Sequence, residues 1–212
     1  RYLPRKKEII YSFPKERLYN IYMTDNLEAI SLHKKTPKIV NAIVEIPKGT
    51  SAKYEYDSEL NIFKLKRCLA PGLKYPCSYG FIPNTLAEDG DCLDILIYND
   101  VPIERGTLVE CTVIGVLDVE DQNGKDCKII GAPTSLAEYF SLDDIDTLCL
   151  KTIQSFFEHY KDGDDNRWCR VNGWAPVEDA YNIIKDSQLD LDGNPTYTTN
   201  SGATNIVDFN NG

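Results

Sequence analysis

The chain has 212 residues, of which 42% are hydrophobic and 26% are charged, and its net charge is −10. This length suits one well-packed domain with extensions, or at most two small domains. No apolar run approaches the roughly 20 residues of a membrane span, and the first eight residues lack the apolar core of a secretory signal, although a start without Met leaves a removed leader open. The acidic balance argues against nucleic acid as a partner, because nucleic-acid binders carry a basic footprint.

Cysteine usage points to a reducing compartment. The seven cysteines are odd in number and scattered, with no C-x-x-C pair, so a disulfide framework is not expected. Only two histidines exist, which argues against a zinc site. The sequence therefore predicts free thiols in a cytoplasmic protein.

Residues 1–37 form an expected N-terminal extension of basic character. Residues 1–38 carry nine Lys or Arg against four Asp or Glu, a net of +5, so the rest of the chain carries −15. Such a stretch could touch an anionic partner, but a solvated surface segment is the favoured interpretation.

From Lys38 onward, short apolar runs alternate with Gly, Pro and Asn-Gly turn signals. This pattern favours a small β-barrel over a parallel sheet. The expected strands are 39–46, 52–56, 62–67, 93–98, 107–119 and 126–131.

Two helices are expected after these strands. The first has a capping-box pattern over 141–144, an apolar face and an end near Lys161, before Gly163. The second begins near Pro176 and turns Ile183 and Ile184 inward. The tail over 189–212 is rich in Asn, Thr, Ser, Gly and Asp, so we expect it to be loosely held or ordered only by a neighbour.

Asp89, Asp91 and Asp94 crowd the head of an apolar strand in the run Asp89-Gly90-Asp91-Cys92-Leu93-Asp94. Like charges about 4 Å apart repel by roughly 4 kcal/mol even at an effective dielectric of ~20. Divalent cations would neutralise such a cluster, and carboxylates without His or Cys select hard ions such as Mg²⁺ or Mn²⁺.

A hairpin is predicted around Asn123-Gly124, which is a strong two-residue turn signal. With those two residues as the loop, Asp121 lies opposite Asp126, and a shared cation would remove their repulsion. Lys128 falls on the same strand face as Asp126. The alternative is a polar hairpin tip that is open to water.

Further polar groups could complete a site for a multiply charged phosphate. Each alone has an ordinary explanation, such as a surface ion pair for Lys53 and Glu55 or core packing for the Tyr75–Gly80 segment. The cationic and phenolic donors are Lys53, Arg67, Tyr79, Lys128, Tyr160 and Lys161.

Over roughly residues 38–188, the chain resembles the soluble inorganic pyrophosphatases that are built on a small OB-like barrel. In that family the aspartate signature reads D-G-D-P-x-D, and here Cys92 replaces the proline. Gln122 stands where a carboxylate can follow Asp121. The other matching runs are Glu45-Ile46-Pro47, Lys53-Tyr54-Glu55, Tyr75-Pro76-Cys77-Ser78-Tyr79-Gly80, Asp126-Cys127-Lys128 and Phe157-Glu158-His159-Tyr160-Lys161.

The resemblance implies a β-rich α+β fold, with a closed five-stranded OB-like barrel flanked by two α-helices. The domain would cover 38–188, between the extension over 1–37 and the tail over 189–212. It also implies a homo-oligomer, a dimer or a hexamer, with inorganic pyrophosphate as the substrate.

The resemblance assigns the metal-binding roles to carboxylates. Asp89, Asp94 and Asp126 would hold the first activating Mg²⁺, and Asp94 would bridge to a second. Asp121 and Asp126 would share an ion that arrives with the substrate. Glu55 would help to hold another ion, and Mn²⁺ could replace Mg²⁺.

The remaining roles concern the attacking water and the substrate. Asp91 would orient and deprotonate a water that bridges the two activating metals. The pKa of a water on such a bridge falls far below its bulk value. The donors that grip the two phosphoryl groups would be Lys53, Arg67, Tyr79, Lys128, Tyr160 and Lys161, with Glu45 and Tyr75 in support.

Two alternatives from other classes stay open at the level of sequence. One is a metal phosphatase that acts on nucleotides or short polyphosphate. The other is a non-catalytic barrel that binds calcium or oligonucleotides. The run over 162–173 resembles a calcium loop, but Arg167 stands where that loop needs Gly, and Gly173 stands where it needs Glu.

Overall fold

The computed structural model describes residues 26–136, 139–162 and 166–190. The predictions for 1–25, for most of the tail and for 163–165 of the calcium-loop-like run lie outside these ranges. None of the described helices is long and apolar enough to cross a membrane.

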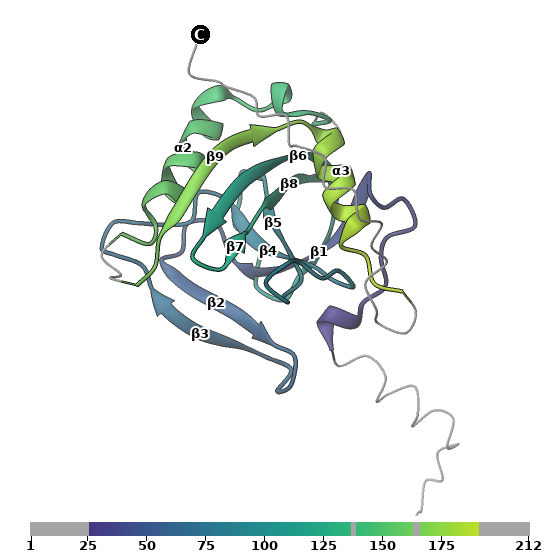
Figure 1. Cartoon of the computed structure of the whole chain (residues 1–212), viewed down its shortest axis with the longest axis horizontal. Helices are drawn as coiled ribbons and strands as arrows, with labels where there is room; N and C mark the ends of the chain where they lie inside the picture. The colour runs from purple at the N-terminus through teal and green to yellow at the C-terminus, as the bar shows by residue number, and fades with distance from the viewer. Residues whose placement is uncertain (1–25, 137–138, 163–165, 191–212) are drawn as a thin grey trace, which may run out of the picture.

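Five strands close into a barrel (Figure 1). In spatial order they are β1 (Ile39–Ile46), β4 (Ser78–Ile82), β5 (Leu93–Ile97), β8 (Lys128–Pro133) and β6 (Leu108–Asp121). The barrel closes because β6 pairs with both β8 and β1, and only the β5–β8 pairing is parallel. This arrangement confirms the predicted OB-like fold.

Four further described strands are not among the five that close the barrel. β2 (Ala52–Asp57) and β3 (Ile62–Cys68) form a separate two-stranded sheet. β7 (Gly124–Lys125) and β9 (Cys169–Ala175) both pair with β6, so this long strand carries the hairpin tip and a further strand beyond the barrel.

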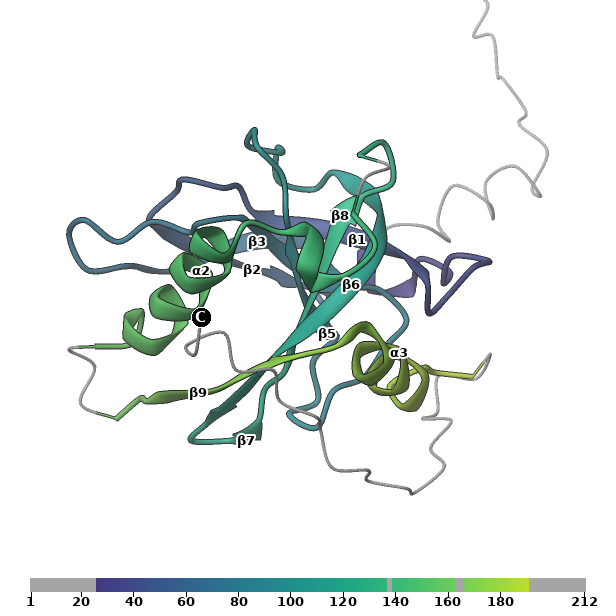
Figure 2. The same cartoon turned by 90° about the horizontal axis from the view of Figure 1, so that it is seen from above.

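The helices lie on the outside of this framework. α2 (Thr147–His159) packs near β9, and α3 (Val177–Asp186) packs on β6. Figure 2 shows the two helices near opposite ends of β9. The described residues also form two 3-10 turns: η1 (Leu27–Ala29) lies before β1, and η2 (Leu142–Asp144) lies before α2.

The helix predicted from a cap at Ser141 is interrupted. Asp144 accepts a hydrogen bond from the backbone N–H of Ser141 at 2.9 Å, but the chain makes only η2 and becomes extended at Ile145. A second cap then starts α2, since the Asp146 side chain accepts from the N–H of Leu148 at 2.8 Å. The predicted start was therefore wrong, because the first cap closes on a single turn.

The second helix follows the prediction more closely. α3 begins at Val177, directly after Pro176, and ends at Asp186. Ile184 is fully buried, whereas Ile183 is only partly buried.

β4 was not predicted as a strand, although all five of its residues are buried. Gly80 at its centre weakens the strand signal, and the barrel needs glycine there. A Cβ atom at this position would lie 1.8 Å from the backbone oxygen of Ile43 on β1. The close approach of β1 and β4 therefore depends on Gly80.

The core lies in two clusters on either side of the barrel wall. One contains Tyr79, Leu117 and Trp174, and it packs under α2; the other contains Ile95 and Ile184, and it lies under α3.

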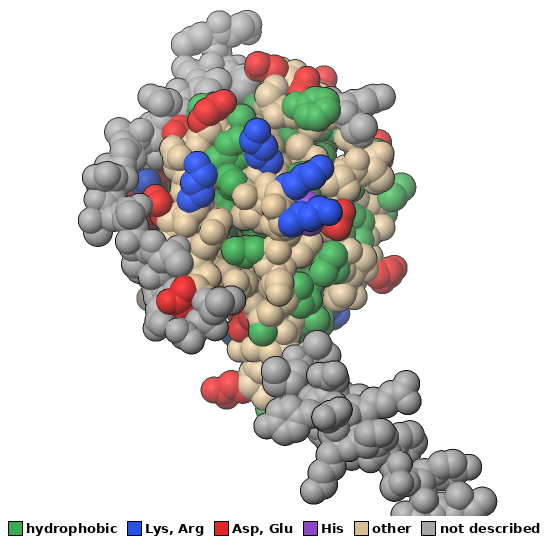
Figure 3. Space-filling model, turned by 90° about the vertical axis from the view of Figure 1, so that its right-hand side faces the viewer, with side chains coloured by type: hydrophobic (Ala, Val, Ile, Leu, Met, Phe, Trp, Pro, Cys, Tyr) green, Lys and Arg blue, Asp and Glu red, His purple; other side chains and the backbone are tan. Residues whose placement is uncertain are grey.

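The described part of the basic N-terminal segment is solvated. Lys34, Lys35 and Lys38 are all exposed. Figure 3 shows one face of the molecule, on which several Lys and Arg side chains gather near a histidine.

Candidate active site

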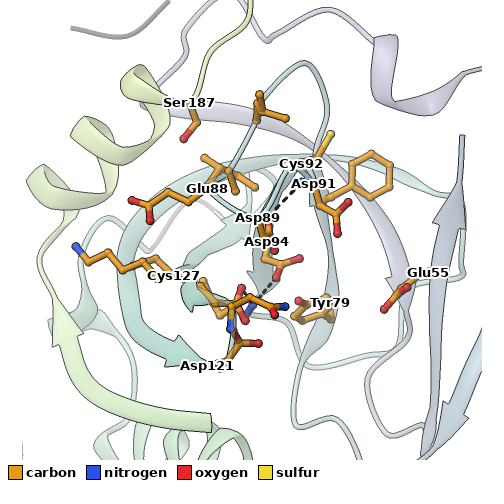
Figure 4. Close-up of a pocket in the computed structure, with 18 of the residues that line it drawn as sticks. Glu55, Tyr79, Glu88, Asp89, Asp91, Cys92, Asp94, Asp121, Cys127 and Ser187 are labelled. Atoms are coloured by element: carbon orange, nitrogen blue, oxygen red, sulfur yellow. Dashed lines mark hydrogen bonds and ion pairs between the residues drawn. The ribbon is translucent and has the colours of Figure 1, made fainter. Parts of the chain in front are cut away.

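A single cleft of about 1840 Å³ receives nearly every residue that the sequence singled out. It is bounded by the barrel strands, the β2–β3 sheet, the loop between β4 and β5, and the end of α2 (Figure 4). The predicted residues that line it are Glu45, Lys53, Glu55, Arg67, Tyr79, Asp89, Asp91, Asp94, Asp121, Asp126, Lys128, Tyr160 and Lys161.

Tyr75 is the one predicted member outside the lining. Its side chain is buried behind the cleft, where its ring centroid lies 5.7 Å from that of Tyr79 and 4.8 Å from that of Phe156. The structure therefore places Tyr75 behind the donor Tyr79, where it packs against the ring.

The loop before β5 carries Asp89 and Asp91 in a tight turn. Gly90 has φ +92°, a left-handed conformation that favours glycine. The N–H of Asp91 donates to Oδ1 of Asp89 at 3.2 Å, and the N–H of Ala87 donates to the backbone oxygen of Asp91 at 2.7 Å. These bonds bring the two carboxylates to the cleft beside Asp94, as Figure 4 shows.

Lysine side chains neutralise the deeper aspartates. Lys128 is almost fully buried, and its Nζ contacts carboxylate oxygens of both Asp94 and Asp126. Lys161 Nζ lies 2.8 Å from Oδ2 of Asp121. Within the described residues, no three His, Cys, Asp or Glu side chains are grouped tightly enough to hold a metal ion as they stand.

The opposite wall comes from the β2–β3 sheet. Glu55 is bound on both oxygens, by Lys53 Nζ at 2.7 Å and by Lys66 Nζ at 2.7 Å. Partial burial opposes ionisation, but the two lysines hold the pKa of Glu55 below its ordinary value. Glu55 raises the pKa of Lys66 in turn.

Sequence reasoning missed Lys66. If the Lys53–Arg67 pairing continued without a shift, Glu55 would lie opposite Leu65, and Lys66 would lie on the other face of the sheet. The register instead shifts after Lys53, so Glu55 pairs with Lys64, and Lys66 lies on the same face. Such a bulge changes which side chains meet, and it left no mark in the sequence.

The carboxylates repel one another. Burial raises the pKa of Asp91, and Asp89, Asp94 and Glu55 raise it further. Burial also raises the pKa of Asp126 to about 6; Lys128 opposes this rise, and the charges of Asp94 and Asp121 add to it. The cleft is therefore a place where additional positive charge is favourable.

Glu45 lies at the floor of the cleft and is buried. Burial is the main cause that raises its pKa to about 8, although its Oε1 accepts a hydrogen bond from the N–H of Tyr56 at 2.6 Å. This carboxylate is mostly protonated at neutral pH.

The end of α2 supplies the remaining donors. Arg67 Cζ lies 5.4 Å from the ring centroid of Tyr160, and its Nη2 donates to the backbone oxygen of Tyr160 at 3.4 Å. Lys161 Nζ lies 5.5 Å from the same ring centroid. The Tyr160 ring thus holds two cationic groups at one corner of the cleft.

The predicted hairpin loop was wrong by one residue, which shifts the strand pairing by two residues. Asp121 pairs with Gly124 rather than with Asp126, because the Asp121 carboxylate accepts from the N–H of Asn123 at 2.7 Å and makes Gln122 and Asn123 the loop. The N–H of Asp126 donates to the backbone oxygen of Val119 at 2.8 Å. The expected face-to-face pair of aspartates is therefore absent from this hairpin.

Comparison with known proteins now places the chain. The family model described as inorganic pyrophosphatase matches residues 42–192. The chain belongs to the inorganic pyrophosphatase family. The match confirms the resemblance to inorganic pyrophosphatases that was inferred from the sequence. It identifies the chain as an inorganic diphosphatase, which is a hydrolase.

Relatives and solved structures of the family agree with this assignment. The "Inorganic pyrophosphatase" of Aeropyrum pernix is 42% identical over 156 residues, which cover 71% of this chain and 89% of that protein. That of Rickettsia typhi is 40% identical over 153 residues, or 69% of this chain and 86% of that protein. The crystal structure of the Thermus thermophilus inorganic pyrophosphatase has a TM-score of 0.72 and 38% identity, and it covers 75% of this chain and 94% of that one.

Proposed function

We propose that this chain hydrolyses inorganic pyrophosphate to two orthophosphates in the described cleft, with Mg²⁺ as its cofactor. The observation that carries the proposal is the pairing of two kinds of wall. One wall carries aspartates, among them Asp91 and Asp126, whose pKa values are raised by burial and by neighbouring carboxylates. The other wall carries Lys, Arg and Tyr donors. A metal–pyrophosphate complex offers the charges that both walls need.

The residues fit hard divalent ions. Every candidate ligand is a carboxylate, and this donor set suits Mg²⁺ and also Mn²⁺. When bound, the ions would lower the pKa of the attacking water and offset the charge of the phosphate groups. The residues that would hold them are Asp89, Asp94, Asp121, Asp126 and Glu55.

Asp91 is our candidate for the group that takes the proton from the attacking water. Its carboxylate lies in the cleft beside Asp94. Burial raises its pKa, and the negative charges of Asp89, Asp94 and Glu55 raise it further. A raised pKa makes a carboxylate a stronger base, and a positioned base contributes typically 10²–10⁴-fold to a rate. Asp91 is therefore the proposed catalytic residue.

The cationic and phenolic groups would bind and orient the phosphoryl groups. Lys128 and Lys161 contact aspartates in the structure, and metal ions at those aspartates would free the ammonium groups to contact phosphate oxygens. Burial keeps Tyr79 and Tyr160 protonated, because it raises the pKa of each phenol, so both can donate hydrogen bonds. The remaining proposed donors are Lys53 and Arg67, while Glu45 and Tyr75 support them.

Further proposals concern the protein as a whole. We propose a catalytic domain over 38–188, supported by the start of β1 at Ile39 and the end of α3 at Asp186. A cytoplasmic location fits the seven cysteines, which are all free. A homo-oligomer remains a proposal from the family resemblance.

The test is phosphate release by the full chain after chelation and after addition of Mg²⁺, with pyrophosphate and ATP as parallel substrates. We expect rapid release from pyrophosphate that requires Mg²⁺ and slow release from ATP. Faster release from ATP would overturn the choice of substrate in favour of a nucleotide phosphatase. Release from neither would leave only a binding protein.

A further inference from the structure

The segment that precedes the barrel crosses the rim of the cleft. η1 lies before residue 42, where the match to the family model begins. Its turn is closed by Asn26, whose side chain accepts from the N–H of Glu28 at 2.9 Å. Glu28 itself lines the cleft.

Two hydrogen bonds attach η1 to opposite parts of that rim. The N–H of Leu27 donates to the phenol oxygen of Tyr56 at 3.0 Å. The backbone oxygen of Glu28 accepts from the N–H of Asn84 at 2.7 Å. Tyr56 belongs to the β2–β3 sheet, and Asn84 starts the loop that carries Asp89 and Asp91. Figure 1 shows the purple turn beside the free end of the β2–β3 sheet.

The β2–β3 sheet depends on such attachments. It has only two strands and no strand pairing with the barrel, and an isolated two-stranded hairpin is marginally stable at best. Tyr56 supplies much of its anchoring, because its ring stacks on Phe81 at 5.9 Å and its N–H donates to Glu45. The adjacent residue, Glu55, is a proposed metal ligand.

The loop that bears Asp89 and Asp91 is also bonded, at Asn84 and Leu86, to the segment that follows α3. The backbone oxygen of Asn84 accepts from the N–H of Leu189 at 3.3 Å, and the N–H of Leu86 donates to the backbone oxygen of Ser187 at 2.7 Å. Asn84 has φ +57°, an uncommon conformation for a residue other than glycine. The segment before β1 and the segment after α3 therefore meet at the start of the loop that bears Asp89 and Asp91.

We propose that η1 is a positioning strap that fixes the β2–β3 sheet relative to the loop of Asp89 and Asp91. It sets the spacing between the Glu55 wall and the aspartate wall, with Tyr56 as the positioning residue. Because those walls hold the proposed metal ligands, the functional consequence rests on the proposed function.

Leu27→Pro is the sharpest single test, because it removes the donated N–H. Proline suits the first position of a helical turn, and the extended conformation of Asn26, with φ −94° and ψ 111°, is the one that a residue before proline needs. Leu27→Ala is the matched control, since it shortens the side chain and keeps the N–H.

Hydrogen–deuterium exchange of the full chain without metal gives a readout that does not depend on activity. We expect Leu27→Pro to speed exchange at 53–57 and 84–93 by roughly three- to tenfold, as the loss of one hydrogen bond implies, while Leu27→Ala stays near wild type. Equal exchange in the two variants would overturn the proposal.

Tyr56→Phe removes the same bond from the other side, together with the bond that the phenol donates to Oδ1 of Asn61 at 2.8 Å, and it keeps the ring that stacks on Phe81. The double variant with Leu27→Pro should exchange no faster than the faster single variant, because both changes remove one shared interaction. Additive effects would contradict the strap.

The functional test measures the Mg²⁺ concentration that gives half-maximal phosphate release from pyrophosphate. This concentration should rise about three- to tenfold in Leu27→Pro, as the loss of one hydrogen bond implies, and it should not rise in Leu27→Ala. An unchanged value would contradict the metal-site consequence. A wild-type chain without pyrophosphatase activity would instead end the proposed function, and the exchange comparison would still decide the strap.

Discussion

Lys161 Nζ lies 2.8 Å from Oδ2 of Asp121, and each of the two side chains is only 9% exposed. Burial opposes the ionisation of Asp121, but this ion pair and the N–H of Asn123 hold its pKa below the ordinary range. Any cation that binds at Asp121 must therefore compete with a lysine that is already in place. The cleft is built so that lysines and metal ions share the same carboxylates.

Lys161→Met should destabilise the metal-free protein by about 3 kcal/mol, because it leaves Asp121 as a buried charge without its partner. For a chain of this size that corresponds to a fall in Tm of roughly 6–12 °C. The double variant with Asp121→Asn should recover most of the loss, since neither charge remains. Thermal unfolding in a chelator measures both, and equal Tm values for the single and double variants would refute the coupling.

Asp91→Asn should lower phosphate release by roughly 10²–10⁴-fold, the usual contribution of a positioned base. The fold should persist, because the change removes a charge that Asp89, Asp94 and Glu55 repel. Steady-state kinetics in saturating Mg²⁺, together with Tm in a chelator, give the two readouts.

Glu88→Gln is the matched control for that experiment. Glu88 lines the same cleft and lies in the same loop, directly before Asp89, but it has no proposed role. We expect its rate to stay within about threefold of wild type, as for a surface charge. A loss as large as that of Asp91→Asn would show that charge in the loop matters, rather than the base.

Glu45→Gln tests the pH dependence of stability. The pKa of Glu45 is about 8 in the folded protein against 4.5 as its ordinary value, so wild-type stability falls as the pH rises between these values. The variant should therefore match wild type near pH 4.5 and exceed its Tm by roughly 8–17 °C at pH 8.5 in a chelator. Mg²⁺ should reduce this Tm difference at pH 8.5, because nearby cations favour the charged form of Glu45. The same offset at both pH values would contradict this account.

The sequence predicted those parts of the fold that depend on local patterns. β1 was predicted over its full length, because its apolar run stops at Pro47. β4 and β9 escaped prediction, since each contains a glycine and depends on neighbours distant in sequence. Gly80 is required by the approach of β1, and Gly173 lies at the register shift where β9 pairs with β6.

The candidate site could be predicted as a set of residues but not as a geometry. Residue types and their order along the chain carried the family resemblance, and the structure brings them to one cleft. The partners of individual groups were not accessible from sequence, because the Asp121 turn shifted the hairpin register and a bulge brought Lys66 to Glu55. Long-range backbone pairing decides such contacts.

The central claim is that the aspartate wall binds the ions on which hydrolysis depends. A titration of phosphate release from pyrophosphate against Mg²⁺, in wild type and in Asp94→Asn, tests it most directly. We predict that wild type is inactive in a chelator and saturates with Mg²⁺, whereas Asp94→Asn loses at least about 100-fold in rate and needs more Mg²⁺. Metal-dependent release that stays intact in Asp94→Asn would contradict the claim.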